Sequence, residues 1–420
     1  MQDIDKIISS KWILSSKNNS LLKDYSIAIE GNIIKDILPS KEVLKKYKST
    51  DHLMLKNNIL VPGLINNNVS TPYIFTRKSL NDNSRQKIDP KKYLELSTNI
   101  SICQMIKNGI TTFTDTSSHP EIVLKQSIKS GIRANVGLPI SSYKSNWANK
   151  EQEYFKKTIS FYDEYRNDPS IKLYLNLNSI HMLSKRGFEK VSQIVSELDV
   201  PVRMHLHEDL NKLNIFKRKY KKRPVKYLEE LGLLGTTFTA INPFHINQSD
   251  LNIMQKYKIH IVHTPSFNIV SRNTQCNTKL FLKNNIKVSI GTGEYIIGNS
   301  VDLFNEMRIA SLLSKLSKDE SNHLTQKELL GLIMKNASNA LGLSFDISRL
   351  EPKCSADIIS IKINNIDMSS IDLYKDIENK LNSNNIEHVW VAGKQILKDK
   401  KLLTINEDML YHKFTELVKK

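Results

Sequence analysis

The chain has 420 residues, and its 61 lysines and arginines exceed its 43 aspartates and glutamates, which gives a formal net charge of +18. A chain of this length can bury a large core, and the length favours one large domain with a smaller one. The basic residues are scattered apart from a cluster at residues 217–223. This scatter is typical of a biased surface composition, so we expect no nucleic-acid partner.

The cysteines and the apolar segments limit the class of protein further. Cys103, Cys276 and Cys354 have no paired spacing, so we expect neither a disulfide framework nor a cysteine-based metal site. The sequence starts with acidic residues and no long apolar run, which does not fit a secretory signal. No window has the apolar length of a membrane span. We therefore expect a cytoplasmic protein with no membrane partner.

The hydrophobic pattern changes twice along the chain. Up to about residue 57, apolar and polar residues alternate between turn signals, which predicts short antiparallel strands. From about 58 to 348, short apolar runs are separated by long helical stretches. Beyond Leu350 the strand-like pattern returns, and it ends in a charged helix from about Glu407. The central region contains eight candidate strands: Ile59–Ile65, Thr111–Asp115, Ala134–Gly137, Leu173–Asn178, Val202–His205, Thr237–Ile241, Ile259–His263 and Val288–Gly291. Eight strand–helix units predict a parallel (β/α)₈ barrel.

Several segments, in order and at sensible intervals, carry a resemblance to a known family. They are Tyr25–Ile37, the run Val61-Pro-Gly-Leu-Ile-Asn-Asn-Asn-Val-Ser70, Gly109–Asp115, Met204–Glu208, Val288–Gly293, Asn299–Arg308, Ala356–Ile359 and His388–Gln395. Together they resemble the amidohydrolase superfamily, in the branch of methylthioadenosine/S-adenosylhomocysteine deaminases and triazine hydrolases. The resemblance implies a TIM barrel over residues 58–348. It also implies a small β-sandwich domain formed by residues 1–57 and 349–420, and a homodimer.

The resemblance implies a metal site at the carboxyl ends of the barrel strands, with two histidines from strand one, one from strand five and an aspartate from strand eight. Here Asn68 and Ser70 occupy the two histidine positions, and Gly293 occupies the aspartate position. His205 is the only retained metal ligand. Amide and hydroxyl groups are weak donors to zinc, which favours imidazole, thiolate or carboxylate.

Other positions match family residues that contact the substrate or move protons. Glu208 corresponds to a glutamate that contacts the purine and transfers protons, so it is a residual acid/base candidate. Asn242 replaces a family histidine after strand six, and Asn178 with His181 follows strand four. Asn268 matches an asparagine that shapes the seventh loop, although turn capping would explain it equally well. Glu208, Asn178 and Asn268 are therefore the substrate-binding candidates.

The remaining polar residues have simpler interpretations. The segment that closes over the substrate in the family would fall near residues 79–90, but here it is polar and has no aromatic residue. Asp115 and Glu306 are expected to hold loops or interfaces. His119 and His245 are expected in loops and not as metal ligands.

The loss of metal donors favours a pseudoenzyme: an amidohydrolase fold without deaminase or hydrolase activity and without a cofactor. Such a protein would bind a small-molecule ligand or a partner, as a homodimer or with a paralogue. The alternative is an active hydrolase on C–N bonds of a purine-like or heterocyclic amine, with zinc or iron in a rearranged site. Its donors would be His205, Glu208, His263 and Glu294, and strand alternation would place His207 on the inward face with His205.

Overall fold

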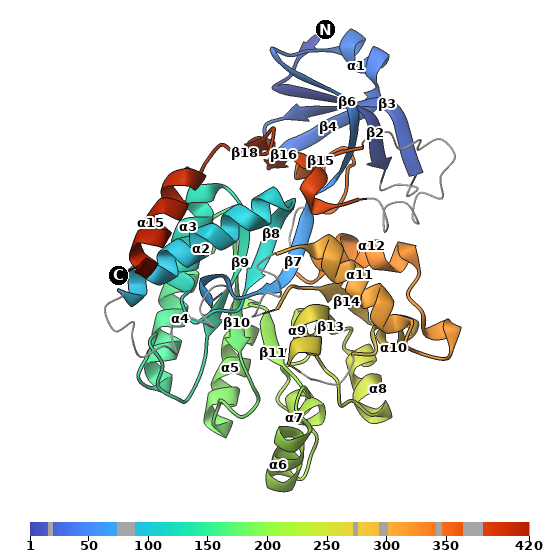
Figure 1. The fold of residues 1–420 in the computed structure, drawn as a ribbon. Coiled ribbons are helices and arrows are strands. Elements are labelled where there is room, and N and C mark those ends of the chain that lie inside the picture. The colour runs from blue at the N-terminus through green and yellow to red at the C-terminus, as the bar shows by residue number, and fades with distance from the viewer. Residues whose placement is uncertain are drawn as a thin grey trace.

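The computed structural model describes residues 1–15, 20–73, 89–271, 276–293, 301–341, 347–363 and 381–419. Two large sheets organise the chain, one of them a barrel and the other a sheet at one end of that barrel (Figure 1). None of the helices in these ranges is long and apolar enough to cross a membrane.

The barrel contains eight neighbouring parallel strands, in the order of the sequence. They are β7 (Leu64–Val69), β8 (Ile110–Asp115), β9 (Arg133–Pro139), β10 (Ile171–Leu177), β11 (Val202–His205), β12 (Phe238–Ile241), β13 (His260–His263) and β14 (Lys287–Ile290). A bridge between Val69 and Gly293 brings the last strand back to the first. The predicted (β/α)₈ barrel is therefore confirmed.

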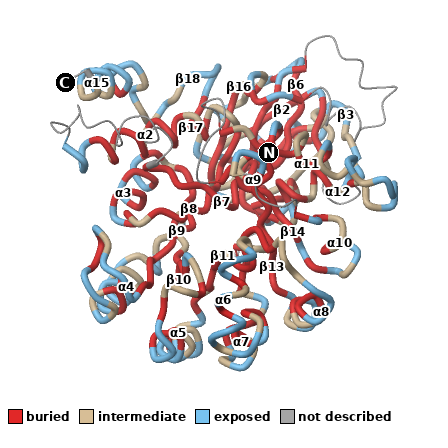
Figure 2. The backbone as a smooth tube through the Cα atoms, turned by 60° about the horizontal axis from the view of Figure 1, so that its bottom comes forward, coloured by how far each residue is buried: buried red, intermediate tan, exposed pale blue. Residues whose placement is uncertain are grey.

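Helices surround the barrel, and buried residues gather toward its centre while exposed residues lie mainly on the outside (Figure 2). They are α2 (Pro90–Lys107), α3 (Pro120–Ser130), α4 (Glu151–Tyr165), α5 (Lys185–Leu198), α6 (Leu210–Tyr220), α7 (Pro224–Glu230), α8 (Gln248–Lys256), α9 (Pro265–Val270), α10 (Thr278–Lys283), α11 (Leu303–Ser314), α12 (Gln326–Ile333) and α13 (Lys335–Asn339). Helix α5 illustrates the pattern. It buries Phe188, Val191 and Ile194 at helical spacing, and the Ser184 hydroxyl accepts a hydrogen bond from the Gly187 N–H at its start.

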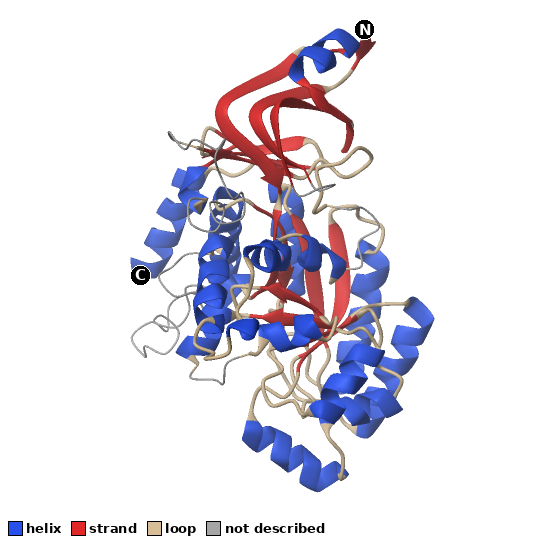
Figure 3. Ribbon diagram, turned by 90° about the vertical axis from the view of Figure 1, so that its right-hand side faces the viewer, coloured by secondary structure: helices blue, strands red, loops and turns tan. Residues whose placement is uncertain are grey.

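The second sheet combines both ends of the chain, in the order β18-β17-β16-β15-β6-β2-β3-β4. Its strands are β2 (Lys6–Ser15), β3 (Ser20–Glu30), β4 (Ile33–Pro39), β6 (Asp51–Pro62), β15 (Ile358–Lys362), β16 (Ile386–Val391), β17 (Lys394–Lys398) and β18 (Lys401–Leu402). Figure 3 shows this sheet curving strongly beyond the end of the barrel. The separate sheet built from both termini is thus confirmed, and its described strands are hydrogen-bonded into one continuous sheet.

Short elements complete the fold. Beside the second sheet lie β1 (Gln2–Asp3), α1 (Ser40–Lys46) and β5 (Tyr47–Lys48), and the 3₁₀ turns are η1 (Thr71–Tyr73), η4 (Glu320–Asn322) and η6 (Ser383–Asn385). The last helix, α15 (Glu407–Lys419), packs along α2, where Lys107 contacts Glu407 at 2.8 Å and the Tyr93 and Phe414 rings lie 5.5 Å apart.

The expected strand Ile59–Ile65 is divided between the two sheets. Strand β6 continues through Pro62 in the outer sheet, where Pro62 lies opposite Ile358. The barrel strand β7 begins only at Leu64. The residue between them, Gly63, has no room for a side chain, since a Cβ there would lie 2.1 Å from the Thr111 hydroxyl oxygen. The chain therefore passes from one sheet into the other at a single glycine.

A buried ion pair fixes the outer sheet to the barrel. Arg133 at the start of β9 contacts Asp357 at 3.0 Å, and the Asp357 side chain is fully buried. The guanidinium also donates to the Ser355 hydroxyl at 2.9 Å. The carboxylate also accepts from the Ala392 N–H at 2.7 Å. These bonds compensate both charges, as a buried pair requires.

Candidate active site

His205 and Glu208 form the polar centre at the carboxyl end of the barrel. His205 ends β11, and its Nδ1 lies 2.8 Å from Glu208 Oε2. Burial alone would raise the pKa of Glu208, but the charge and hydrogen bond of His205 outweigh it and hold this pKa below its ordinary value. Both residues line a pocket of about 20 Å³, room for one water molecule. The pair is therefore placed to exchange protons with a molecule in this pocket.

The residues after β10 contribute to the pocket differently from the sequence expectation. His181 lines it beside His205, and burial lowers the pKa of His181. Asn178, the substrate-binding candidate on this loop, is exposed and does not line that pocket. Loop conformation places the imidazole of His181, and not the amide of Asn178, toward the pocket.

The three substituted ligand positions are buried where β7 meets the end of β14. Asn68 is 1% exposed, and its Oδ1 has no hydrogen-bond partner. Ser70 is also buried. Gly293 has a φ of +82°, and a Cβ there would lie 2.6 Å from the Cβ of Phe267. The backbone at position 293 therefore suits glycine and opposes the carboxylate residue of the family pattern.

Two asparagines that the sequence identified separately belong to one hydrogen-bond network. Asn242 follows β12 and adopts a positive φ of 49°. Its Nδ2 donates to the Thr264 hydroxyl at 2.9 Å, and its Oδ1 accepts from the Thr264 N–H at 3.1 Å and from Asn268 Nδ2 at 3.3 Å. All three residues are buried. The network fixes the loops after the sixth and seventh strands relative to each other.

His207 faces an acidic neighbour beyond the strand end. Strand β11 stops at His205, and His207 adopts a φ of +58°, so strand alternation does not decide its direction. Its Nδ1 lies 3.6 Å from Asp250, which also binds Arg223. Burial lowers the pKa of His207 to about 4, so the ring is neutral at pH 7.

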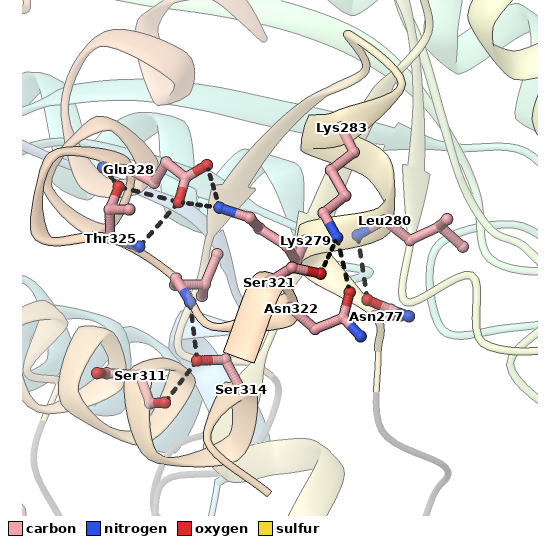
Figure 4. A network of polar contacts seen from close by, with 11 residues as sticks. Asn277, Lys279, Leu280, Lys283, Ser311, Ser314, Ser321, Asn322, Thr325 and Glu328 are labelled. Atoms are coloured by element: carbon pink, nitrogen blue, oxygen red, sulfur yellow. Dashed lines mark hydrogen bonds and ion pairs between the residues drawn. The ribbon is translucent and has the colours of Figure 1, made fainter. Parts of the chain in front are cut away.

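His263 lies in a different pocket from His205. Its Nδ1 lies 3.1 Å from the Thr278 hydroxyl, and it lines a pocket of about 250 Å³ between α10 and α11. Figure 4 shows the polar network of this wall, in which Lys279 contacts Glu328 at 2.7 Å and the Ser314 hydroxyl accepts from the Leu324 N–H at 3.1 Å. These polar groups bind one another and hold the helices together.

The proposed donor set for a rearranged metal site is therefore not assembled. His260 and His263 lie on opposite faces of β13. His260 lies on the inward face, where it contacts Ser289 of β14, so His263 points away from His205 and Glu208 into a different pocket. Glu294, the fourth proposed donor, lies outside the described residues, as do residues 74–88 with most of the expected substrate-closing segment.

The described donors do not fit a zinc or iron centre by themselves. In the described ranges, no three histidine, cysteine, aspartate or glutamate side chains are grouped to hold a metal. The former ligand positions offer the His205 imidazole, the unpartnered Asn68 amide oxygen and the Ser70 hydroxyl. Structural and catalytic zinc sites use three or four imidazole, thiolate or carboxylate donors. One imidazole with an amide and a hydroxyl falls short of that requirement.

Asp115 and Glu306 hold loops near the site. Asp115 accepts from the backbone and hydroxyl of Thr71 at 2.8 and 2.7 Å and from the Ser117 N–H at 2.8 Å. Glu306 accepts from the Ser266 N–H at 2.9 Å in the first turn of α9, and burial raises the pKa of Glu306 to about 7.

One buried charge was missed by the sequence interpretation. Arg203 is 1% exposed inside the barrel, and its guanidinium lies 5.2 Å from the centre of the Tyr174 ring. Burial lowers the pKa of Arg203 to about 10, which leaves it charged at pH 7. The sequence could have shown this position, because Arg203 lies two residues before His205 in a four-residue strand and must therefore point to the same inward face as His205.

The barrel with a polar carboxyl end and a sheet made from both termini defines an enzyme-type architecture. The sequence model of the amidohydrolase family matches residues 59–396. The chain belongs to the amidohydrolase family.

Relatives of the chain match it along nearly its whole length. A 5-methylthioadenosine/S-adenosylhomocysteine deaminase of Saccharophagus degradans is 26% identical and covers 97% of this chain and 95% of its own. A 5'-deoxyadenosine deaminase of Methanococcus vannielii is 27% identical, with coverage of 96% and 97%.

Solved structures share the fold. An adenosine deaminase from Xanthomonas campestris with bound zinc has a TM-score of 0.92 at 21% identity, covering 100% of this chain and 98% of its own. A triazine hydrolase from Arthobacter aurescens has a TM-score of 0.84 at 16% identity, with coverage of 99% and 100%.

These comparisons correct the pseudoenzyme interpretation of the sequence. The relatives are named deaminases, which supports the active hydrolase instead. The expectation of no cofactor is likewise unsupported, because a structural neighbour holds zinc. The sequence interpretation gave more weight to the lost metal ligands than to the half-buried His205–Glu208 pair, whose side chains lie 2.8 Å apart.

Proposed function

We propose that the protein is a hydrolase that breaks a C–N bond of a purine-like or heterocyclic amine and releases ammonia. The observation that carries this proposal is the His205–Glu208 pair at the end of the fifth barrel strand, in a chain similar to deaminases along its length. The names of these relatives share an adenosine unit that is altered or substituted at its 5' position. An adenosine of this kind is therefore the first substrate class to test.

The chemistry assigns a role to each residue of the pair. Water forms a bond to the ring carbon that bears the amine, and the C–N bond then breaks. Glu208 accepts the proton of the water and delivers it to the departing nitrogen, while His205 orients the carboxylate. Acid/base catalysis of this kind contributes about 10²–10⁴-fold to the rate. Asn268 and Asn242 fix the neighbouring loops, which border the substrate.

Zinc or iron belongs to this proposal as the family's usual source of an activated water. Such an ion lowers the pKa of a bound water from its high value in bulk water to about 7. His205 is the described residue that would hold it. Because the other described donors do not complete a site, none of the steps above passes through the metal.

The test is ammonia release from 5'-methylthioadenosine, S-adenosylhomocysteine and 5'-deoxyadenosine, with the protein prepared in zinc, in iron(II) or with neither. We expect turnover of at least one substrate, and its loss in Glu208→Gln and His205→Ala. Glu189→Gln, at an exposed position of α5, is the matched control and should behave as wild type. No ammonia from any substrate in any preparation would overturn the proposal.

A further inference from the structure

The interior of the barrel contains a cation whose hydrogen-bonding groups are incompletely used. Arg203 Nη2 donates to the backbone carbonyl of Asn67 on the first strand. Its Nε and Nη1 are buried and have no hydrogen-bond partner. Within the described ranges, no carboxylate forms an ion pair with Arg203. This guanidinium therefore differs from Arg133, whose buried charge is matched by Asp357.

The surroundings of Arg203 provide polar groups but no negative charge. His260 Nε2 and Asn67 Nδ2 both lie 2.9 Å from the Ser289 hydroxyl, so these three side chains bind one another. The Asp115 carboxylate accepts hydrogen bonds from Thr71 and Ser117 and, among the described contacts, forms no ion pair with Arg203. The Tyr174 ring face attracts the guanidinium, but its hydroxyl donates away, to the Asp115 carbonyl at 2.7 Å.

A buried charge without a counterion is unfavourable, and so is a buried N–H group without an acceptor. Arginine cannot relieve this by losing its proton at neutral pH. Water could satisfy the N–H groups, but it would leave the charge unbalanced. A bound anion satisfies both requirements, and unpartnered buried groups in a folded protein point to an ion or water of this kind.

We propose that Arg203 Nε and Nη1 bind a small inorganic anion of the chloride type inside the barrel. The anion must be small, because the neighbouring residues Asn67, Tyr174 and His260 are each at most 3% exposed. Arg203 and His205 share one face of β11, so the anion lies below the His205–Glu208 pair and neutralises a positive charge beneath it. This site does not depend on the proposed deaminase activity.

Thermal unfolding of the full chain in sodium chloride and in sodium gluconate at equal ionic strength tests this site. Chloride should raise the Tm of the wild type above its value in gluconate by roughly 2–4 °C in a saturable manner, because the ligand binds only the folded state. Arg218→Met, at a basic position of α6, controls for surface charge and should retain the difference. Arg203→Met should abolish it, and an equal chloride effect in that variant would overturn the proposal.

A second measurement does not depend on a folded Arg203 variant. Crystals of the wild type grown with bromide should give an anomalous peak within hydrogen-bond distance of Arg203 Nε and Nη1. Water alone at this position, with no anomalous signal, would overturn the proposal.

Discussion

The N–H of Gly293 donates a hydrogen bond to the carbonyl of Asn68 at 2.9 Å, and this bond joins two of the substituted ligand positions at the seam of the barrel. The strands approach so closely here that a Cβ on Gly291 would lie 2.4 Å from the Asn68 nitrogen. The substitutions at 68 and 293 are therefore parts of one packed junction. Restoring one family residue at this seam would disturb the others.

Gly293→Asp should destabilise the protein instead of restoring a metal ligand. The left-handed φ of +82° and the contact with Phe267 both oppose a side chain. We expect a loss of about 2–4 kcal/mol in the free energy of unfolding, from backbone strain together with overpacking. Urea unfolding measures it, with Gly235→Asp as control because that position has open space and no positive φ. Unchanged stability of Gly293→Asp would contradict the geometry at this seam.

Glu208→Gln should lower kcat/KM for deamination by about 10²–10⁴-fold while changing the unfolding midpoint little. Burial opposes the ionised form of Glu208, but the charge and hydrogen bond of His205 have the larger effect, so the pKa of Glu208 is lowered. Activity that uses this carboxylate as a base should therefore persist to a pH below the ordinary glutamate range. A pH–rate profile measures this, and an acid limb above pH 4.5 that survives in Glu208→Gln would exclude Glu208 as its source.

Arg133→Met should cost about 3–5 kcal/mol of stability, because it leaves Asp357 buried and unpaired between the barrel and the outer sheet. The exposed pair of Lys185 and Glu189 at 3.9 Å serves as comparison, and Lys185→Met should cost less than about 1 kcal/mol. In the double variant Arg133→Met/Asp357→Asn, the loss should be smaller than the sum of the single losses. Equal losses of stability in Arg133→Met and Lys185→Met would refute the structural role of the buried ion pair.

Glu306 should make stability depend on pH near neutrality. Its pKa is about 7 in the folded protein, raised by burial from an ordinary value of 4.5. The folded state thus holds this proton more tightly than the unfolded chain does. The resulting stabilisation is fully present below pH 4.5 and is lost as pH rises through about 7. The free energy of unfolding should fall by on the order of 3 kcal/mol over this range.

Glu306→Gln should remove this part of the pH dependence, since glutamine keeps an acceptor for the Ser266 N–H without titrating. Chemical unfolding across that pH range, with Glu320→Gln as an exposed control, measures the difference. Parallel curves for wild type and Glu306→Gln would rule out the carboxyl as the cause.

The sequence predicted the barrel well because the barrel strands are short segments, mostly buried, between long helical stretches. Val202–His205 has the predicted bounds, and the other central strands differ mainly by one or two residues. The division at Gly63 was not predictable from the apolar pattern, because it depends on contact with Thr111 in another element. The local hydrophobic pattern predicts where strands lie, whereas contacts with other elements decide which sheet each strand joins.

The site was less predictable because side-chain direction at strand ends depends on register and loop conformation. His205 and Glu208 are three residues apart, and the structure brings them together. His263 appeared equally well placed in the sequence, but it lies in the outer pocket with Thr278. The preference for a pseudoenzyme came from the count of missing ligands, whereas the names of the relatives support an active hydrolase.

The passage from β6 into β7 at Gly63 constrains how the protein can be shortened. In the outer sheet, β15 lies between β6 and β16 and pairs with both. A chain that starts at Leu64 would keep every barrel strand but leave the β6 side of β15 open. An apolar strand with an open edge is a template for pairing with other chains. Truncated variants that lack the N-terminal strands should therefore aggregate, because the first 62 residues cover the edge that the C-terminal strands would otherwise expose.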